Sequence, residues 1–519
     1  MAVTAAHPDV TVVVAVYNTM PYLRECLASL VGQTIGVDRL EVIAVDDGST
    51  DESGAELDSW AERYPDTIKV LHQANSGGPA MPSNRALELA TGRYVFFIGA
   101  DDHLGAEALK RLVTTADRLD ADIVLGRMVG AGGRYVNQAV YKPGNRDSIT
   151  LADSDLCWAL SNTKLFRRSL LEENGIRYPE QMSSYSDQPF TLRAVVAARR
   201  IAVRADYEFY YAVRRDDQSN ITYRTSVLRF LQDAEVVMDT VADVVTDPVS
   251  RARVLRRNFT WEVYKLVSDR YVAAGPEERR QVQEGVRKLS DTYLTEEIRA
   301  SLDVHRRVPI SIAQHGTLED LNTVAEYAKE YGLGPLLVEG EHIYTALPGF
   351  RNPDADYPDA WFEVPVEAAS AKAQRWPATV TWRTGNAQTA ALHVEWSSRL
   401  SALGDGASAW VGNVEAKRLE AVPRQDGGLT IRAEFALADL ATGLGWKAKR
   451  LKFRHSAADD AIVHDVTAAK PAVLSVRYRR GLRFYKIAVR INEKSRLSVV
   501  INPFQPRKLA GRLVRKLRP

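Results

Sequence analysis

The strongest constraint on the fold is a regular alternation of apolar runs and helical patterns over residues 10–125. The predominantly apolar runs are Val10–Val16, Leu40–Val45, Ile68–Leu71 and Tyr94–Ile98. Runs of this kind are typical of parallel strands buried on both faces of a sheet. Between the first two runs, Leu23, Leu27 and Leu30 recur at helical spacing. The alternation predicts a doubly wound α/β sheet, in which ligands bind beyond the carboxyl ends of the strands.

The sequence pattern changes after the α/β region. We predict an α/β catalytic domain at 1–225, a helical region at 226–345, a β-sandwich at 346–500 and a basic amphipathic tail at 501–519. The helical region is predicted from an apolar stripe that runs from Val227 to Val241. The sandwich is predicted from short runs of β-branched and aromatic residues divided by Gly, Asp, Asn and Pro. The stretch 347–359, which holds three prolines and three aspartates, is the expected linker.

Composition excludes several classes of protein. A hydrophobic fraction of 45% and a charged fraction of 26% are those of a globular chain and argue against disorder. The two cysteines, Cys26 and Cys157, cannot form a disulfide framework and have no metal-cluster pattern around them. No apolar run has the length of a membrane span or the setting of a signal peptide. We therefore expect a soluble, cytoplasmic protein.

Basic residues gather at the C-terminal end of the chain. From Arg477 onward there are 14 Lys or Arg residues and one acidic residue, whereas the whole chain is nearly balanced at 68 against 66. This asymmetry predicts an anionic partner, which could be a membrane surface, an acidic polymer or nucleic acid. In the tail, Leu509, Leu513 and Leu517 recur every four residues among basic ones, as in a helix that lies on an anionic membrane. A disordered solubilising tail is the alternative; nucleic acid is not expected, because no motif accompanies the charge.

Paired carboxylates follow two of the predicted strands. Asp46 and Asp47 come directly after the second strand, and Asp101 and Asp102 follow the fourth. Unpaired charges are costly to bury, so these side chains belong to turns, helix caps or a ligand site. Hard carboxylate oxygens at a strand end suit Mn²⁺ or Mg²⁺ bridging a diphosphate, where the metal neutralises charge on a leaving group.

Three more polar loops carry candidate residues. The glycine-rich segment 75–79 allows close backbone approach to a ligand, although glycines also serve ordinary turns. In the segment 183–190, Asp187 is either a helix N-cap or a general base that deprotonates an incoming hydroxyl. The arginines and hydroxyls of 214–222 either hold phosphates or form a solvated loop.

Taken in order, these segments resemble family 2 glycosyltransferases of the GT-A fold over roughly residues 9–225. The matching text is VTVVVAVYN, LASLVGQT, LEVIAVDDGSTD, NSGGPAMPSN, ALELATGRYVFFIGADD, SNTKLFRRSLLEENGIRYPE and SDQPF. The resemblance implies a Rossmann-like, nucleotide-sugar-binding domain. It also implies an inverting single displacement from a UDP-sugar donor.

The resemblance assigns roles to individual positions. It implies nucleotide-sugar contacts by Ala15, Val16, Tyr17, Asp47, Asn75, Asn84, Ala100, Asp101, Arg214, Arg215 and Ser219. Within this set Asp47 is the expected hydrogen-bond acceptor for uracil, and Asp101 is the expected metal ligand. Asp187 matches the catalytic base.

The chain departs from the family pattern at three positions. Gly99 replaces the first aspartate of the Asp-X-Asp motif, Ser186 replaces the acidic residue before the base, and Ser83 replaces an arginine. The alternative to an enzyme is therefore a non-catalytic glycan-binding or scaffolding protein built on a GT-A shell.

The layout as a whole is similar to that of the wall teichoic acid glycosyltransferases of Gram-positive bacteria, whose C-terminal β-domains assemble trimers. This similarity implies transfer of an N-acetylhexosamine or a hexose to a cell-envelope glycopolymer by a homo-oligomer. The predicted sandwich serves either oligomerisation or glycan binding. Its tryptophans suit stacking on sugars or packing in a core: Trp376, Trp382, Trp396, Trp410 and Trp446.

Overall fold

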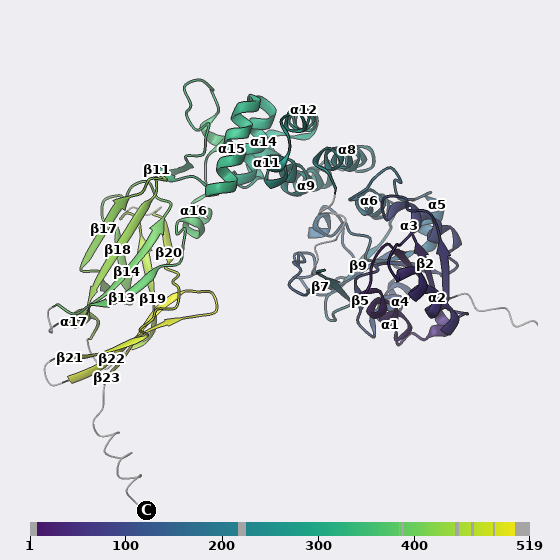
Figure 1. Cartoon of the computed structure of the whole chain (residues 1–519), viewed down its shortest axis with the longest axis horizontal. Helices are drawn as coiled ribbons and strands as arrows, with labels where there is room; N and C mark the ends of the chain where they lie inside the picture. Colours follow the sequence, from purple (N-terminus) through teal and green to yellow (C-terminus); the bar gives the residue numbers. More distant parts are fainter. Residues whose placement is uncertain are drawn as a thin grey trace, which may run out of the picture. The chain divides into compact units, whose positions relative to one another are not determined.

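A computed structural model describes residues 8–215, 225–383, 385, 389–441, 446–457, 461–480 and 483–503 of the chain (Figure 1). It divides into two compact units. Unit 1 comprises Met1–Leu302 and Ala313–Leu318, and unit 2 comprises Asp303–Ile312 and Glu319–Pro519. None of the described helices is both long and apolar enough to cross a membrane.

A seven-stranded sheet forms the centre of unit 1, with the strand order β3-β2-β1-β4-β8-β6-β9. Its strands are β1 (Val10–Val16), β2 (Leu40–Asp46), β3 (Ile68–His72), β4 (Tyr94–Gly99), β6 (Ile123–Gly126), β8 (Leu165–Arg167) and β9 (Ile201–Arg204). Among these strands, β8 alone runs antiparallel to its neighbours. The predicted α/β sheet is confirmed, with the polar segments that follow β1, β2 and β4 at one edge.

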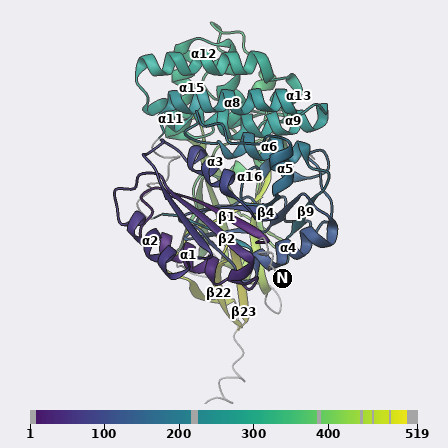
Figure 2. The ribbon, with the colours of Figure 1, turned by 90° about the vertical axis from the view of Figure 1, so that its right-hand side faces the viewer.

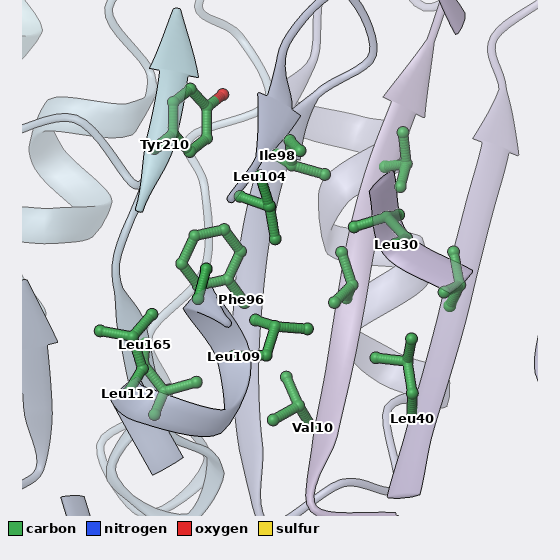
Figure 3. Close-up of a cluster of buried hydrophobic side chains, with 14 of the residues drawn as sticks. Val10, Leu30, Leu40, Phe96, Ile98, Leu104, Leu109, Leu112, Leu165 and Tyr210 are labelled. Carbon is green, nitrogen blue, oxygen red and sulfur yellow. The ribbon is translucent and has the colours of Figure 1, made fainter. Parts of the chain in front are cut away.

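Helices cover this sheet, and a small second sheet flanks it. The helices are α1 (Leu23–Val31), α2 (Ser53–Arg63), α3 (Ala80–Leu89), α4 (Ala108–Leu119), α5 (Arg168–Glu173) and α6 (Asp187–Ala197). The small sheet joins β5 (His103–Leu104), β10 (Tyr210–Val213) and β7 (Met128–Ala131). Figure 3 shows how Val10, Leu30, Phe96 and Leu109 meet in one buried cluster. Burial of this apolar surface is the main force that holds helices to sheet.

From Val227 onward, unit 1 consists of helical segments (Figure 2). The segments are α8 (Val227–Val244), α9 (Pro248–Asn258), a π-helical turn at Phe259–Val263, α10 (Tyr264–Leu266), α11 (Asp269–Ala273), α12 (Pro276–Tyr293) and α13 (Glu296–Ser301). The apolar stripe predicted on α8 is buried, including Phe230 and Val241. α8 packs on α6, so the helical region supports the helix that begins with Asp187.

Unit 2 begins with helices and ends in antiparallel sheets. After α14 (Val304–His315), which both units share, come α15 (Leu318–Tyr331), the hairpin β11 (Leu336–Glu339) and β12 (His342–Thr345), and α16 (Val366–Lys372). The first sheet has the order β13-β14-β18-β17, from Thr379–Arg383, Ala391–Ser398, Leu429–Ala436 and Arg418–Pro423. α17 (Leu437–Leu440) follows β18.

The second sheet of unit 2 has the order β16-β15-β19-β23-β22-β21, with β20 beside β19. Its strands are β15 (Ser408–Val411), β16 (Val414–Glu415), β19 (Trp446–Arg454), β20 (Val463–Asp465), β21 (Ser475–Arg480), β22 (Arg483–Ile491) and β23 (Leu497–Pro503). The predicted C-terminal all-β architecture is confirmed.

Three expectations for the C-terminal part of the chain can be compared with the structure. The expected linker at 347–359 lies inside unit 2, where Phe350 packs on Phe362 and Tyr357 stacks on Trp361. Among the tryptophans, Trp396 is 2% exposed and belongs to the core, whereas Trp376 is 58% exposed. The predicted tail helix falls in 504–519, outside the described residues.

Candidate active site

Asp47 fixes the loop that follows β3. Its backbone amide donates to the carbonyl of Val16 at 2.8 Å, which ties the ends of β1 and β2 together. Its carboxylate accepts hydrogen bonds from the Ser76 amide at 3.1 Å, the Ser76 hydroxyl at 2.9 Å and the Gln73 amide group at 2.6 Å. The predicted uracil acceptor therefore lies at the carboxyl ends of the strands, and it also shapes the segment 73–76.

The two predicted asparagines make contacts that hold loops. Asn75 donates to the Asp47 carbonyl at 3.0 Å and accepts from the Gly77 amide. Asn84 is buried, donates to the Tyr178 carbonyl at 2.9 Å and accepts from the Tyr178 amide at 2.8 Å. A direct contact of either residue with the sugar nucleotide stays a prediction.

The predicted contacts on β1 differ in their accessibility. Val16 is buried, Ala15 is half-buried and Tyr17 is 41% exposed. Tyr17 is therefore the most accessible of the three for stacking on a base, and Val16 can offer a ligand little beyond its backbone.

Gly99 makes room for the carboxylates at the end of β4. A Cβ atom at this position would stand 2.9 Å from Asp102 Oδ2 and 3.0 Å from Asp101 Oδ1. Asp102 is buried and accepts from the Tyr210 hydroxyl at 2.6 Å and the Val213 amide at 2.7 Å. Its burial and the adjacent Asp101 raise its pKa to about 6. Asp102 thus anchors β10 to the end of β4, and Ala100 beside it is buried as well.

Arg215 closes the site from the β10 side. Its Nε lies 2.7 Å from Asp101 Oδ2, and its Nη1 donates to the Asn18 carbonyl at the end of β1. Arg214 is exposed beside it. Ser219 lies outside the described residues. The predicted phosphate-binding arginine therefore reaches the predicted metal ligand.

At the end of β4, Asp101 is the candidate ligand for a divalent cation. Within the described part of the chain, no three His, Cys, Asp or Glu side chains form a metal cluster. Mg²⁺ is commonly held by one or two carboxylates together with substrate phosphates. Asp101, half-buried at the strand end, fits that arrangement.

Asp187 begins α6 at the end of the base loop, by which we mean residues 182–187. This loop borders the glycine-rich segment: a Cβ atom on Gly78 would stand 3.3 Å from the Met182 carbonyl oxygen. Burial raises the pKa of Asp187 to about 6, although the positive charges of Arg257 and Lys164 act against that rise. A carboxylate with such a pKa is ionised at neutral pH and still basic enough to accept a proton.

Cations from two elements surround Asp187. Lys164 is buried just before β8, donates to the Ser161 carbonyl, and has its pKa lowered to about 7 by burial. Arg257, at the end of α9, donates to Gln188 at 2.6 Å and to both oxygens of Glu262 at 2.8 Å. The Nε of Arg257 is buried without a hydrogen-bond partner among the residues that the structure describes.

The base loop is held by the helical region. The buried Asp233 of α8 accepts from the Ser184 amide at 2.9 Å and from its hydroxyl at 2.8 Å. Tyr185 has a left-handed backbone with φ 60°, and its ring packs edge-on against Phe230. The phenol oxygen accepts from Lys265 at 3.1 Å. These contacts fix the residues immediately before Asp187.

Sequence reasoning missed the charged residues that surround this loop and the base. They are Lys164, Asp233, Arg257 and Glu262. Two of them could have been found because a charged residue stands among apolar ones: Asp233 lies within the apolar stripe of α8, and Glu262 lies between Trp261 and Val263. The π-helical turn at Phe259–Val263 brings Glu262 to 3.0 Å from Gln188. Turns of this kind are often found at functional sites, but sequence periodicity does not reveal them.

Two protein-family models match parts of the chain. The model described as glycosyl transferase family 2 matches residues 11–176, and the glycosyl transferase TarS linker domain matches residues 228–325. An uncharacterized glycosyltransferase, EpsJ of Bacillus subtilis, is 30% identical over 235 residues, which cover 43% of this chain and 67% of EpsJ.

Two curated relatives carry more specific names. A poly(ribitol-phosphate) beta-glucosyltransferase of Bacillus spizizenii is 40% identical over 209 residues, or 40% of this chain and 33% of that protein. The poly(ribitol-phosphate) beta-N-acetylglucosaminyltransferase TarS of Staphylococcus aureus is 36% identical over 208 residues, or 40% and 36%. The chain thus matches only about a third of the length of these two relatives.

Solved structures show the same likeness. Residues 1–349 of S. aureus TarS with UDP-GlcNAc align with a TM-score of 0.57 and 26% identity, over 66% of this chain and 97% of that one. The longer S. aureus TarS structure aligns with a TM-score of 0.62 and 21% identity, over 96% and 86%. The second likeness concerns the fold alone.

Proposed function

The chain belongs to glycosyltransferase family 2, and we propose that it transfers a sugar from a UDP-sugar to a hydroxyl of an anionic cell-envelope glycopolymer with inversion at the anomeric carbon. The donor sugar is an N-acetylhexosamine or a hexose, in line with the names of its relatives. The acceptor is a polyol-phosphate polymer of the teichoic acid class.

The observation that carries this proposal is the position and basicity of Asp187. Its carboxylate begins α6 at the end of a loop that borders Gly78, and its pKa is raised to about 6. Asp187 accepts the proton of the acceptor hydroxyl as that oxygen bonds to the anomeric carbon. The bond from the anomeric carbon to the diphosphate breaks in the same step, and UDP leaves with the electron pair.

The strand-end residues hold the donor during this step. Asp47 and the loop that it fixes receive the uracil, and Arg215 turns from Asp101 to the diphosphate. Asp101 and the diphosphate oxygens would hold Mn²⁺ or Mg²⁺, which supplies positive charge for the departing UDP when bound. The departure at Gly99 is compatible with this role, since the glycine provides space for both neighbouring carboxylates.

The cations near Asp187 favour an anionic acceptor. Arg257 acts on the charge of Asp187, and Lys265 reaches the base loop through Tyr185, with its own pKa lowered by burial. The names of the curated relatives, which act on poly(ribitol phosphate), support the same class of acceptor.

The proposal also includes an oligomeric state and a location in the cell. We propose a homo-oligomer, a trimer by resemblance, assembled through the β-sheets of unit 2. We also propose that the protein works on the cytoplasmic side of the membrane, in peripheral contact with it through the basic tail at 501–519.

The decisive experiment measures UDP release from a panel of UDP-sugars, with Mn²⁺, with Mg²⁺ and with chelator, because many transferases slowly hydrolyse their donor without acceptor. We expect release from one donor, dependence on the metal, and loss of release in Asp187→Asn while UDP binding by calorimetry is retained. UDP binding without turnover, both alone and with a polyol-phosphate acceptor, would instead support the non-catalytic glycan-binding alternative.

A further inference from the structure

Four basic side chains share one exposed face of the second sheet in unit 2. They are Arg477 and Arg479 of β21 and Lys486 and Arg490 of β22, and we call them the basic face. Because side chains alternate along a strand, residues 477 and 479 point to one side and Tyr478 to the other. Tyr478 and its partner Tyr485 are buried, so the basic side chains occupy the solvent side.

The pairing register sets like charges against each other. Arg477 lies directly opposite Lys486 in the antiparallel pair of β21 and β22. Like charges in directly opposed positions destabilise a sheet. Among the residues that the structure describes, no acidic side chain lies within ion-pair distance of Arg477, Lys486 or Arg490. These three positive charges therefore lie close together without a neutralising carboxylate among the described residues.

Protection of a sheet edge explains only part of this pattern. Charged residues on an edge strand prevent pairing with other chains, and β21 is the edge of its sheet. β22, however, lies between β21 and β23, so Lys486 and Arg490 guard no edge. On β19 of the same sheet, by contrast, Arg450 has its charge balanced by Asp465 at 2.9 Å. Neither protection of an edge nor a carboxylate in the sheet explains Lys486 and Arg490, which indicates a partner outside the sheet.

We propose that the basic face binds the polyol-phosphate acceptor polymer as a second site, outside the catalytic unit. This inference rests on the proposed function for the nature of the polymer. Cations two residues apart on a strand stand about 7 Å apart, and neighbouring strands lie about 5 Å apart. Such a two-dimensional array contacts several phosphates of a linear polyanion at once, which raises the apparent affinity of a long chain through multivalency.

The residues of the basic face favour a polyol-phosphate polymer over a membrane or a single-stranded nucleic acid. Surfaces that insert into a membrane carry a broad apolar area, whereas Phe484, opposite Arg479, is the one large exposed apolar side chain described among the basic residues of this face. Single-stranded nucleic acid is held by several aromatic platforms, and this face offers one. A phosphate-rich, weakly stacking polymer fits the charge and needs no apolar contact.

Arg477→Glu provides a sharp test, because the new carboxylate would face Lys486 and form a favourable cross-strand pair. The sheet should therefore keep its melting temperature while the polymer loses a contact. With the full chain we expect purified poly(ribitol phosphate) to bind about fivefold to tenfold more weakly, with a salt dependence that is shallower by about one power of the salt concentration. Lys417→Glu, an exposed lysine before β17 with the same change in charge, should bind like the wild type.

Enzymatic readouts separate this inference from the proposed function. In Arg477→Glu, the KM for a long polymer should rise several-fold, whereas the KM for a fragment of a few repeats and the rate of UDP release without acceptor should not change. Equal polymer binding by Arg477→Glu and the wild type would overturn the inference. So would a loss confined to phosphatidylglycerol vesicles or to single-stranded DNA, or a change of oligomeric mass without a change in polymer binding. Failure of the proposed function would show instead as absent UDP release in every variant.

Discussion

The donor side and the acceptor side of the candidate site are held in different ways. The segments at the ends of β1, β2 and β4 hold one another, as when Asp47 binds Ser76 and Arg215 binds Asp101. The base loop and the start of α6 are held from outside the sheet, the loop by Asp233 of α8 and Gln188 of α6 by Glu262. The helical region thus supports the candidate base and does more than connect two domains.

This difference predicts that donor binding and turnover can be separated by mutation. A change at the strand ends should affect the binding of UDP first. A change in the helices should leave UDP binding intact and affect the chemical step, because its influence reaches the site through the base loop. Substitutions on the two sides, taken from the largest expected effect to the smallest, test this division.

Exchanging one carboxylate on each side should lower turnover in both variants but weaken UDP binding in only one. Asp187→Asn removes the base and should lower the rate of transfer by about 10²–10⁴-fold with little change in the Kd for UDP. Asp101→Asn should weaken metal-dependent UDP binding and lower turnover with it. Calorimetry with and without Mn²⁺, together with initial rates, measures both quantities. Equal loss of UDP binding in the two variants would remove the distinction between the sides.

Removal of the Asp233 anchor should cause the next largest effect. In Asp233→Ala the Ser184 amide and hydroxyl lose their acceptor, so the base loop should no longer hold Asp187 in place. We expect kcat, measured from initial rates, to fall about tenfold or more, since small displacements of a catalytic group are costly, while the Kd for UDP stays unchanged.

Two further variants control for a general loss of structure. Asp233→Asn keeps an oxygen acceptor and should restore much of the activity. Asp243→Ala removes a carboxylate from the same helix, where it forms an exposed pair with Arg193, and should behave as the wild type. If Asp243→Ala lowers kcat as much as Asp233→Ala, the effect belongs to the stability of α8 and not to the anchor.

The sequence was informative where local pattern determines structure. Aliphatic runs identified the strands. The polar residues at their ends indicated where to propose donor binding, because strand ends in such a sheet meet at one edge. The proposed role of Asp187 came from resemblance to a family. The support of the base loop by Asp233 and of Gln188 by Glu262 could not be predicted, because it depends on contacts between residues 49 and 74 positions apart in the chain and on a π-helical turn.

The pH dependence of kcat/KM provides the finest test of the link between helices and base. Asp187 must be ionised to accept a proton, so with a pKa of about 6 the rate should rise with pH through 6 and level off above 7. Asp102 has a similar pKa, so the position of this rise alone does not identify the base.

Glu262→Gln removes a negative charge that raises the pKa of Asp187, and the rise in kcat/KM should therefore move to lower pH by about one unit at most. The control Glu284→Gln, at an exposed pair with Arg280 on α12, should leave the profile in place. An unshifted profile in Glu262→Gln would mean that the group around Glu262 positions the loop without acting on the charge of Asp187.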